Sequence, residues 1–234
     1  MSDSRFVTID ARFRGPPDSG NGGYVCGMVA AAAGEPVAVR LKRPPPLGVP
    51  LAFDEADGVL RLMQGETIVA EARPAAVDLE VPPPPDHAEA VIASLGYIGF
   101  AQHPFPGCFV CGPKRLAGDG LRIFAGPLGD RSLVAAPWIP DGTLAGPDGA
   151  ISPEFLWAAL DCPGCFATPM AGRLALLGEL AARIERPLRP GEPCVVTGWE
   201  RHTEGRKHFA GTAIFGPDGD LVARAAATWI AMKE

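Results

Sequence analysis

Two segments of the chain combine residue types that could polarise a carbonyl group and activate water. In the first segment, Asn21 precedes Gly22-Gly23-Tyr24, and these residues begin an apolar stretch that predicts a helix. A helix N-terminus offers unpaired N–H groups and a partial positive charge, so the N–H groups near Gly23 and Tyr24 could hold a developing oxyanion. Asn21 could orient water or the carbonyl group. The alternative is a glycine turn chosen only for its backbone angles.

The second segment contains the strongest candidate for a base, Asp161. This residue follows the apolar run 155–160 of a second predicted helix, 152–161, which stops near Pro163-Gly164. Burial and the C-terminal end of the helix dipole would both raise the pKa of its carboxyl group. Alternatively, Asp161 caps the turn that follows it. Asp18 is a second candidate base, although it also fits an ordinary turn residue.

The six cysteines include two Cys-x-x-Cys pairs, which together have the ligand number of a tetrahedral zinc site. The pairs are Cys108 with Cys111 and Cys162 with Cys165, and 50 residues separate them. This separation exceeds the usual spacing in zinc ribbons. Free cysteines at a helix end also pack well as small apolar residues. We therefore expect no bound metal.

Composition excludes several classes of protein. The chain has 234 residues, of which 47% are apolar, and a formal net charge of −6. The apolar fraction is large enough for a folded core, whereas the mild acidity argues against a nucleic-acid-binding protein. No stretch approaches the ~20 apolar residues that span a bilayer, and no secretory signal is evident. We expect a cytoplasmic protein with reduced thiols. The excess of arginine over lysine is typical of a high-GC bacterial genome.

An internal repeat suggests two similar halves. The pattern x-Arg-Pro-x-x-x-Gly-x-Pro occurs at 42–50 and again at 185–193, an offset of 143 residues. A predicted hairpin with a glycine turn follows each copy, at 59–72 and at 207–230. Leu174–Glu185 has helical propensity, but the repeat aligns its end with a strand, so we predict that it is extended.

The repeat divides the chain into an N-terminal half at 1–86, a linker with a short helix at 87–107, and a C-terminal half at 108–234. Each half is predicted to contain one long helix, near 22–33 and near 152–161, and several antiparallel strands. The predicted fold class is therefore α+β.

This layout resembles the hotdog fold of acyl-CoA thioesterases and dehydratases, and the duplication resembles the double-hotdog thioesterases. The residues that carry the resemblance are Gly20-Asn21-Gly22-Gly23-Tyr24, Cys108-Phe109-Val110-Cys111-Gly112 and Leu156-Trp157-Ala158-Ala159-Leu160-Asp161. An Asp on the central helix is similar to the phenylacetate-type thioesterases. The hotdog dehydratases pair an Asp with a His shortly after it, and the absence of such a pair disfavours that activity.

The resemblance implies hydrolysis of an acyl thioester by water that a carboxylate activates. It implies an acyl-CoA or acyl-carrier thioester as the partner, no nucleic acid, no membrane and no cofactor beyond the coenzyme A of the substrate, and it allows a homodimer. It also implies that the pair Cys108 and Cys111 needs no metal. Residues expected to bind substrate are Gly22, Gly23, Tyr24, Trp157, which could line an acyl tunnel, and Arg206, which could meet phosphates or simply face solvent.

The alternative function is a non-catalytic acyl-CoA or acyl-carrier binding protein of the same fold. One structural observation separates the two functions. An enzyme requires Asp161 to point into a cavity that also meets the helix start at Gly22-Gly23.

Overall fold

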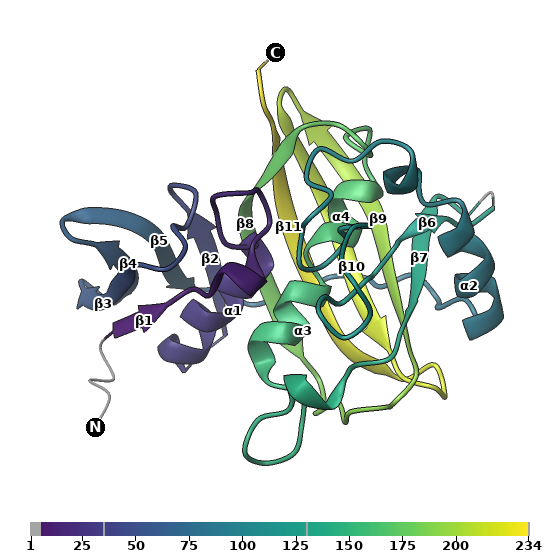
Figure 1. Cartoon of the computed structure of the whole chain (residues 1–234), viewed down its shortest axis with the longest axis horizontal. Helices are drawn as coiled ribbons and strands as arrows, with labels where there is room; N and C mark the ends of the chain where they lie inside the picture. Colours follow the sequence, from purple (N-terminus) through teal and green to yellow (C-terminus); the bar gives the residue numbers. More distant parts are fainter. Residues whose placement is uncertain (1–5, 35, 130, 234) are drawn as a thin grey trace.

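The described strands form one eleven-stranded antiparallel sheet to which both halves contribute. A computed structural model describes residues 6–34, 36–129 and 131–233. The N-terminal half provides β1 (Phe6–Thr8), β2 (Val37–Leu41), β3 (Pro50–Ala56), β4 (Val59–Gln64) and β5 (Thr67–Pro74). The C-terminal half provides β6 (Gly126–Pro127), β7 (Leu133–Trp138), β8 (Ala175–Ile184), β9 (Cys194–Glu204), β10 (Lys207–Phe215) and β11 (Leu221–Ala231). The order across the sheet is β1-β3-β4-β5-β2-β8-β11-β10-β9-β7-β6 (Figure 1).

The two halves meet where β2 pairs with β8. Ala38 lies opposite Ala181, and these residue numbers differ by 143, the offset of the sequence repeat. From this junction, β5, β4, β3 and β1 follow on one side, and β11, β10, β9 and β7 follow in the equivalent order on the other. The chain therefore has a local twofold relation between Ala38 and Ala181. The prediction that Leu174–Glu185 is extended is confirmed, since β8 occupies most of it.

The repeated motif makes the same turn in both halves. The N–H groups of residues 42 and 43 both donate to the carbonyl oxygen of Val69, at 2.8 and 3.3 Å. The N–H groups of residues 185 and 186 donate to the carbonyl oxygen of Val222, at 2.8 and 3.4 Å. The glycine of the motif has a positive φ in both copies, which explains why glycine stands there.

The helices differ more between the halves than the strands do. They are α1 (Gly22–Ala33), α2 (His87–Leu95), α3 (Pro153–Ala159) and α4 (Cys162–Phe166), with single 3-10 turns at Ala11–Phe13, Ile98–Phe100 and Gly142–Leu144. None of the described helices combines the length and the apolar character needed to cross a bilayer. The C-terminal half was predicted to contain one long helix, and this is wrong. The chain turns at Asp161, and Pro163 then occupies the first turn of α4, where proline is tolerated.

Two glycines let α1 approach α3 closely at the centre of the molecule (Figure 1). A Cβ atom on Gly23 would lie 2.5 Å from the Cβ atom of Asp161. A Cβ atom on Gly27 would lie 2.6 Å from the Cα atom of Glu154. Neither position has room for a side chain, and this packing brings the start of α1 to Asp161.

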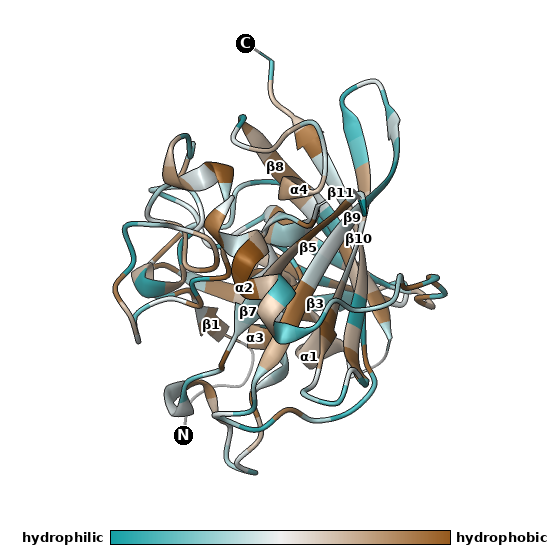
Figure 2. Ribbon diagram, turned by 90° about the vertical axis from the view of Figure 1, so that its right-hand side faces the viewer, coloured by the Kyte–Doolittle hydropathy of each residue, from teal (hydrophilic) through white to brown (hydrophobic). Residues whose placement is uncertain are grey.

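The far end of the β9–β10 hairpin is polar and exposed. The residues from Glu200 to Lys207 are all exposed, and the ribbon there is coloured hydrophilic (Figure 2). The main apolar core lies between the sheet and the central helices α1, α3 and α4, and a smaller one lies between the sheet and α2. The end of this hairpin is therefore solvent-facing and lies away from the main core.

Candidate functional site

A mostly apolar cavity of about 260 Å³ opens beside the start of α1 and the junction of α3 with α4. Asn21 and Gly22 line it from α1, and Asp161 lines it from the junction. Asp161 and Gly22 thus line one cavity, whereas Gly23 is not part of its lining. The apolar wall includes Cys165, Phe166, Met170, Leu177 and Trp229.

The carboxylate of Asp161 is buried, with 1% of the residue exposed. Its Oδ2 atom accepts hydrogen bonds from the Asn21 Nδ2 atom at 2.8 Å and from the Gly23 N–H at 2.9 Å. Its Oδ1 atom has no partner among the described residues. Because a buried polar atom without a partner is costly, Oδ1 is free to accept a further hydrogen bond.

Burial raises the pKa of Asp161 to about 7, and the nearby Cys108 acts in the same direction. The hydrogen bonds from Gly23 and Asn21 act in the opposite direction. Burial therefore acts as the sequence predicts. The sequence also predicts that a helix C-terminus raises this pKa. In the structure Asp161 lies between the C-terminus of α3 and the N-terminus of α4, and the dipoles of the two helices have opposite effects on the pKa there.

The expected oxyanion donors are already engaged. The Gly23 N–H donates to Asp161, and the Tyr24 N–H donates to the Asn21 Oδ1 atom at 2.9 Å. The prediction for these two N–H groups is therefore wrong. The Gly22 N–H, at the first residue of α1, has no hydrogen-bond partner in the described part of the chain, and Gly22 lines the cavity. The amide of Asn21 is also engaged at both ends, so it orients Asp161 rather than a water molecule.

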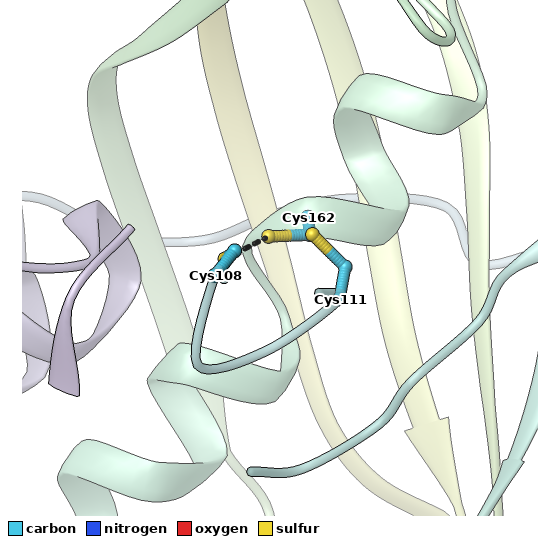
Figure 3. A group of neighbouring side chains, drawn as sticks. All are labelled: Cys108, Cys111 and Cys162. Carbon is cyan, nitrogen blue, oxygen red and sulfur yellow. Dashed lines mark hydrogen bonds between the residues drawn. The ribbon is translucent and has the colours of Figure 1, made fainter. Parts of the chain in front are cut away.

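Three buried cysteines line the same cavity. The Sγ atoms of Cys108, Cys111 and Cys162 lie within 4.8 Å of one another (Figure 3). Hydrogen bonds from the thiols of Cys111 and Cys162 hold the pKa of the Cys108 thiol well below its usual range. The spacing argument against a shared site fails in the folded chain, because Cys162 joins the first pair while its partner in sequence, Cys165, does not.

Two solved structures align with nearly the whole chain. The tesB protein of Mycobacterium avium subsp. paratuberculosis is 15% identical over 97% of this chain and 92% of its own, with a TM-score of 0.64. A candidate thioesterase from Novosphingobium aromaticivorans is 14% identical over 100% of this chain and 98% of its own, with a TM-score of 0.61. No protein-family model and no curated protein sequence matches the chain.

The chain has the double hotdog fold. The paired halves of the sheet and the helices at its centre establish this architecture, and the full-length matches agree with it. Identities this low establish the fold alone, and the same fold can carry different activities.

Five predicted site residues are absent from the lining of the cavity of the double hotdog. Gly23 is one of them, although its N–H donates to Asp161. Asp18 is exposed in the loop before α1. Tyr24 stacks on Phe13, with ring centroids 4.3 Å apart, and burial raises its pKa to about 12. Trp157 packs against α1 instead of lining an acyl tunnel. Arg206 lies at the β9–β10 turn and donates to the carbonyl oxygen of Ala231 at 3.2 Å.

The cavity also contains residues that the sequence argument missed. Arg43 and Arg173 are exposed basic residues in its lining, and neither has an ion pair among the described residues. Trp229 provides an aromatic wall. His103 lies in the lining beside the cysteines. One of these residues could have been found from the repeat, in which Arg43 is the counterpart of Arg186. A comparison of the acidic residues near the two arginines in sequence was a usable signal.

Proposed function

We propose that this protein hydrolyses acyl-CoA thioesters. The observation that carries the proposal is the Oδ1 atom of Asp161, a buried acceptor without a protein partner. Asp161 lines a cavity that is also lined by Gly22, the first residue of a 12-residue helix. A base and a helix N-terminus on one apolar cavity are the two parts that thioester hydrolysis needs.

The N-terminus of α1 and the residue Asp161 have different tasks in the reaction. The carbonyl oxygen of the thioester accepts a hydrogen bond from the Gly22 N–H, where the dipole of α1 favours the developing negative charge. The Oδ1 atom of Asp161 accepts a proton from a water molecule as the water oxygen attacks the carbonyl carbon. The tetrahedral intermediate then expels the coenzyme A thiolate, which takes up the proton held by Asp161. Asn21 and the Gly23 N–H hold Oδ2 and so aim Oδ1 at the water.

The lining of the cavity fits the two ends of an acyl-CoA. Phe166, Met170 and Leu177 form an apolar wall for the acyl group. Arg43 and Arg173 are positioned to pair with the phosphates of coenzyme A. The full-length structural neighbours are a tesB protein and a candidate thioesterase, and these names support the same reaction class.

The test is a screen of short, medium, long and aromatic acyl-CoAs with the full chain. Hydrolysis should be followed by the loss of thioester absorbance, because the six free cysteines of the chain would react with a thiol reagent. Calorimetry on the same preparation measures binding. Turnover of at least one acyl-CoA is expected. Tight binding without turnover would overturn the proposal in favour of an acyl-CoA binding protein, and the absence of both would remove acyl-CoA as the ligand.

A further inference from the structure

We propose that Cys108, Cys111 and Cys162 bind one zinc ion. The proposal goes beyond thioester hydrolysis and replaces the sequence-based expectation of a chain without metal. It starts from three buried sulfur atoms, all within 4.8 Å of one another, contributed by two segments far apart in sequence (Figure 3). Thiolate sulfur is a preferred ligand of zinc, and a set of three is found in known zinc sites.

The backbone holds the first two sulfur atoms close together. The loop from Cys108 to Gly112 closes with a hydrogen bond from the Gly112 N–H to the carbonyl oxygen of Cys108, at 3.0 Å. A Cβ atom on Gly112 would lie 2.5 Å from the backbone of Cys108, so only glycine permits this tight turn. The turn also directs the N–H groups of Val110 and Cys111 at the Cys108 sulfur.

The distance to the third sulfur fits a shared metal ion. The Sγ atoms of Cys108 and Cys162 are 3.8 Å apart. In a tetrahedron with zinc–sulfur bonds of about 2.3 Å, two sulfur ligands stand about 3.8 Å apart. The separation is much longer than a disulfide bond, and all three cysteines are free. Cys162 is the first residue of α4, so the turn at Asp161 is what presents it to the loop.

Polar side chains around the sulfur atoms donate hydrogen bonds toward them. The Nδ2 atom of Asn21, which already donates to Asp161, lies 3.9 Å from the Cys108 sulfur. The Nδ1 atom of His103 accepts a hydrogen bond from the Phe105 N–H at 2.9 Å, so its proton sits on Nε2. That Nε2–H group points at the Cys111 sulfur, 3.3 Å away. Donors of this kind stabilise thiolates that hold a metal.

The three cysteines leave the fourth coordination position of the zinc ion open toward the cavity. His103 cannot fill it through Nε2 while that nitrogen carries the proton, and the sulfur of Cys165 lies outside the group of three. All three ligands line the cavity, so a water molecule from it can complete the tetrahedron. All three sulfur atoms bind zinc as thiolates, so the protons that the thiols carry are released to solvent. The resulting single negative charge is offset by the surrounding hydrogen-bond donors.

The first test uses the unaltered full chain. Metal is removed with a chelator under reducing, anaerobic conditions, and Zn²⁺ is returned and counted by mass spectrometry after desalting. Roughly one ion per chain is expected. Co²⁺ in place of Zn²⁺ should give the intense visible absorption of a tetrahedral site and a near-ultraviolet sulfur-to-cobalt band. A chain that retains no metal, or a pale octahedral cobalt spectrum, overturns the proposal.

Variants then identify the ligands. Cys111→Ser and Cys162→Ser should weaken Zn²⁺ binding by more than the ~10–100-fold that a change in an outer hydrogen bond costs. His103→Phe should fall within that smaller range. The matched controls are Cys165→Ser, Cys26→Ser and Cys194→Ser, all buried thiols outside the group. Loss of metal from Cys165→Ser equal to that from Cys111→Ser would refute the assignment. The cobalt spectrum of the unaltered chain decides the question if a variant fails to fold.

Discussion

The two halves of the molecule share a scaffold but contribute different chemistry. Arg43 and Arg186 occupy the same position of the repeated turn. Arg186 is bound on both sides, to Asp220 and to Glu192, each at 2.5 Å. Arg43 has no ion pair within the described residues and instead lines the cavity. The same residue therefore supports the fold in one half and remains available to a ligand in the other.

The helices diverge in the same way. In the N-terminal half, α1 is continuous, and its first residue, Gly22, lines the cavity. In the C-terminal half, the chain breaks at Asp161 between α3 and α4, and this break places a carboxylate and then Cys162 at the cavity. The duplication thus produced a single site from two unequal parts, and neither half contains all of it.

The largest expected effect separates the two candidate carboxylates. Asp161→Asn keeps an acceptor for Asn21 and Gly23 but removes the base, so kcat should fall by ~10²–10⁴-fold. The melting temperature should hold or rise, because a buried charge is removed. Asp18→Asn, in the exposed loop of the other half, should leave both quantities unchanged. Wild-type turnover by Asp161→Asn on an established substrate would refute its role as the base.

The two glycines of α1 test how closely the halves must pack. Gly23→Ala and Gly27→Ala both force α1 away from α3, and each should lower the free energy of unfolding by about 1–3 kcal/mol. Only Gly23 touches Asp161, so turnover per folded molecule should fall in Gly23→Ala and stay near normal in Gly27→Ala. Urea unfolding and initial rates measure the two effects. Equal losses of turnover would show that the helix spacing, and not the position of Asp161, controls activity.

The repeated arginines should respond in opposite ways. Arg186→Gln should cost about 1 kcal/mol of stability, since its ion pairs are partly exposed, and leave KM unchanged. Arg43→Gln should leave stability unchanged and raise KM for an acyl-CoA roughly fivefold, the equivalent of about 1 kcal/mol for one exposed phosphate contact. High salt should reduce the effect on KM. If both variants change the stability and neither changes KM, the two arginines do not differ in role and the prediction is wrong.

The smallest effect is the pH dependence of the ion pair between Arg186 and Asp220. The hydrogen bond from Arg186 lowers the pKa of Asp220 below 3.8. The ionised pair therefore stabilises the fold above that value, and its contribution is lost as the pH falls through the lower pKa of the folded state. The stability difference between wild type and Arg186→Gln should narrow from about pH 7 to about pH 3. Arg43→Gln should show no such narrowing.

The local elements of this protein were predictable because their signals are local. The apolar run after Gly22 predicted α1, and Gly34 ended it with a φ of 69°. The repeat overruled the helical propensity of Leu174–Glu185 correctly, because the β2–β8 pairing requires a strand there. Local signals failed at Pro163, which was predicted to end a helix but lies in the first turn of α4. Trp157 and Arg206 were assigned to the site by residue type, and their contacts lie elsewhere.

The sequence by itself determined the duplication, the hairpins, the start of α1 and the choice of Asp161. These features depend on neighbouring residues or on the repeat. Only the tertiary structure decided which N–H groups stay free, because the Gly23 N–H is taken by a carboxylate 138 residues away. It also decided that Cys162 joins Cys108 across 54 residues of chain. Contacts across such separations depend on how the strands pair and the helices pack, which the spacing of residues along the chain does not encode.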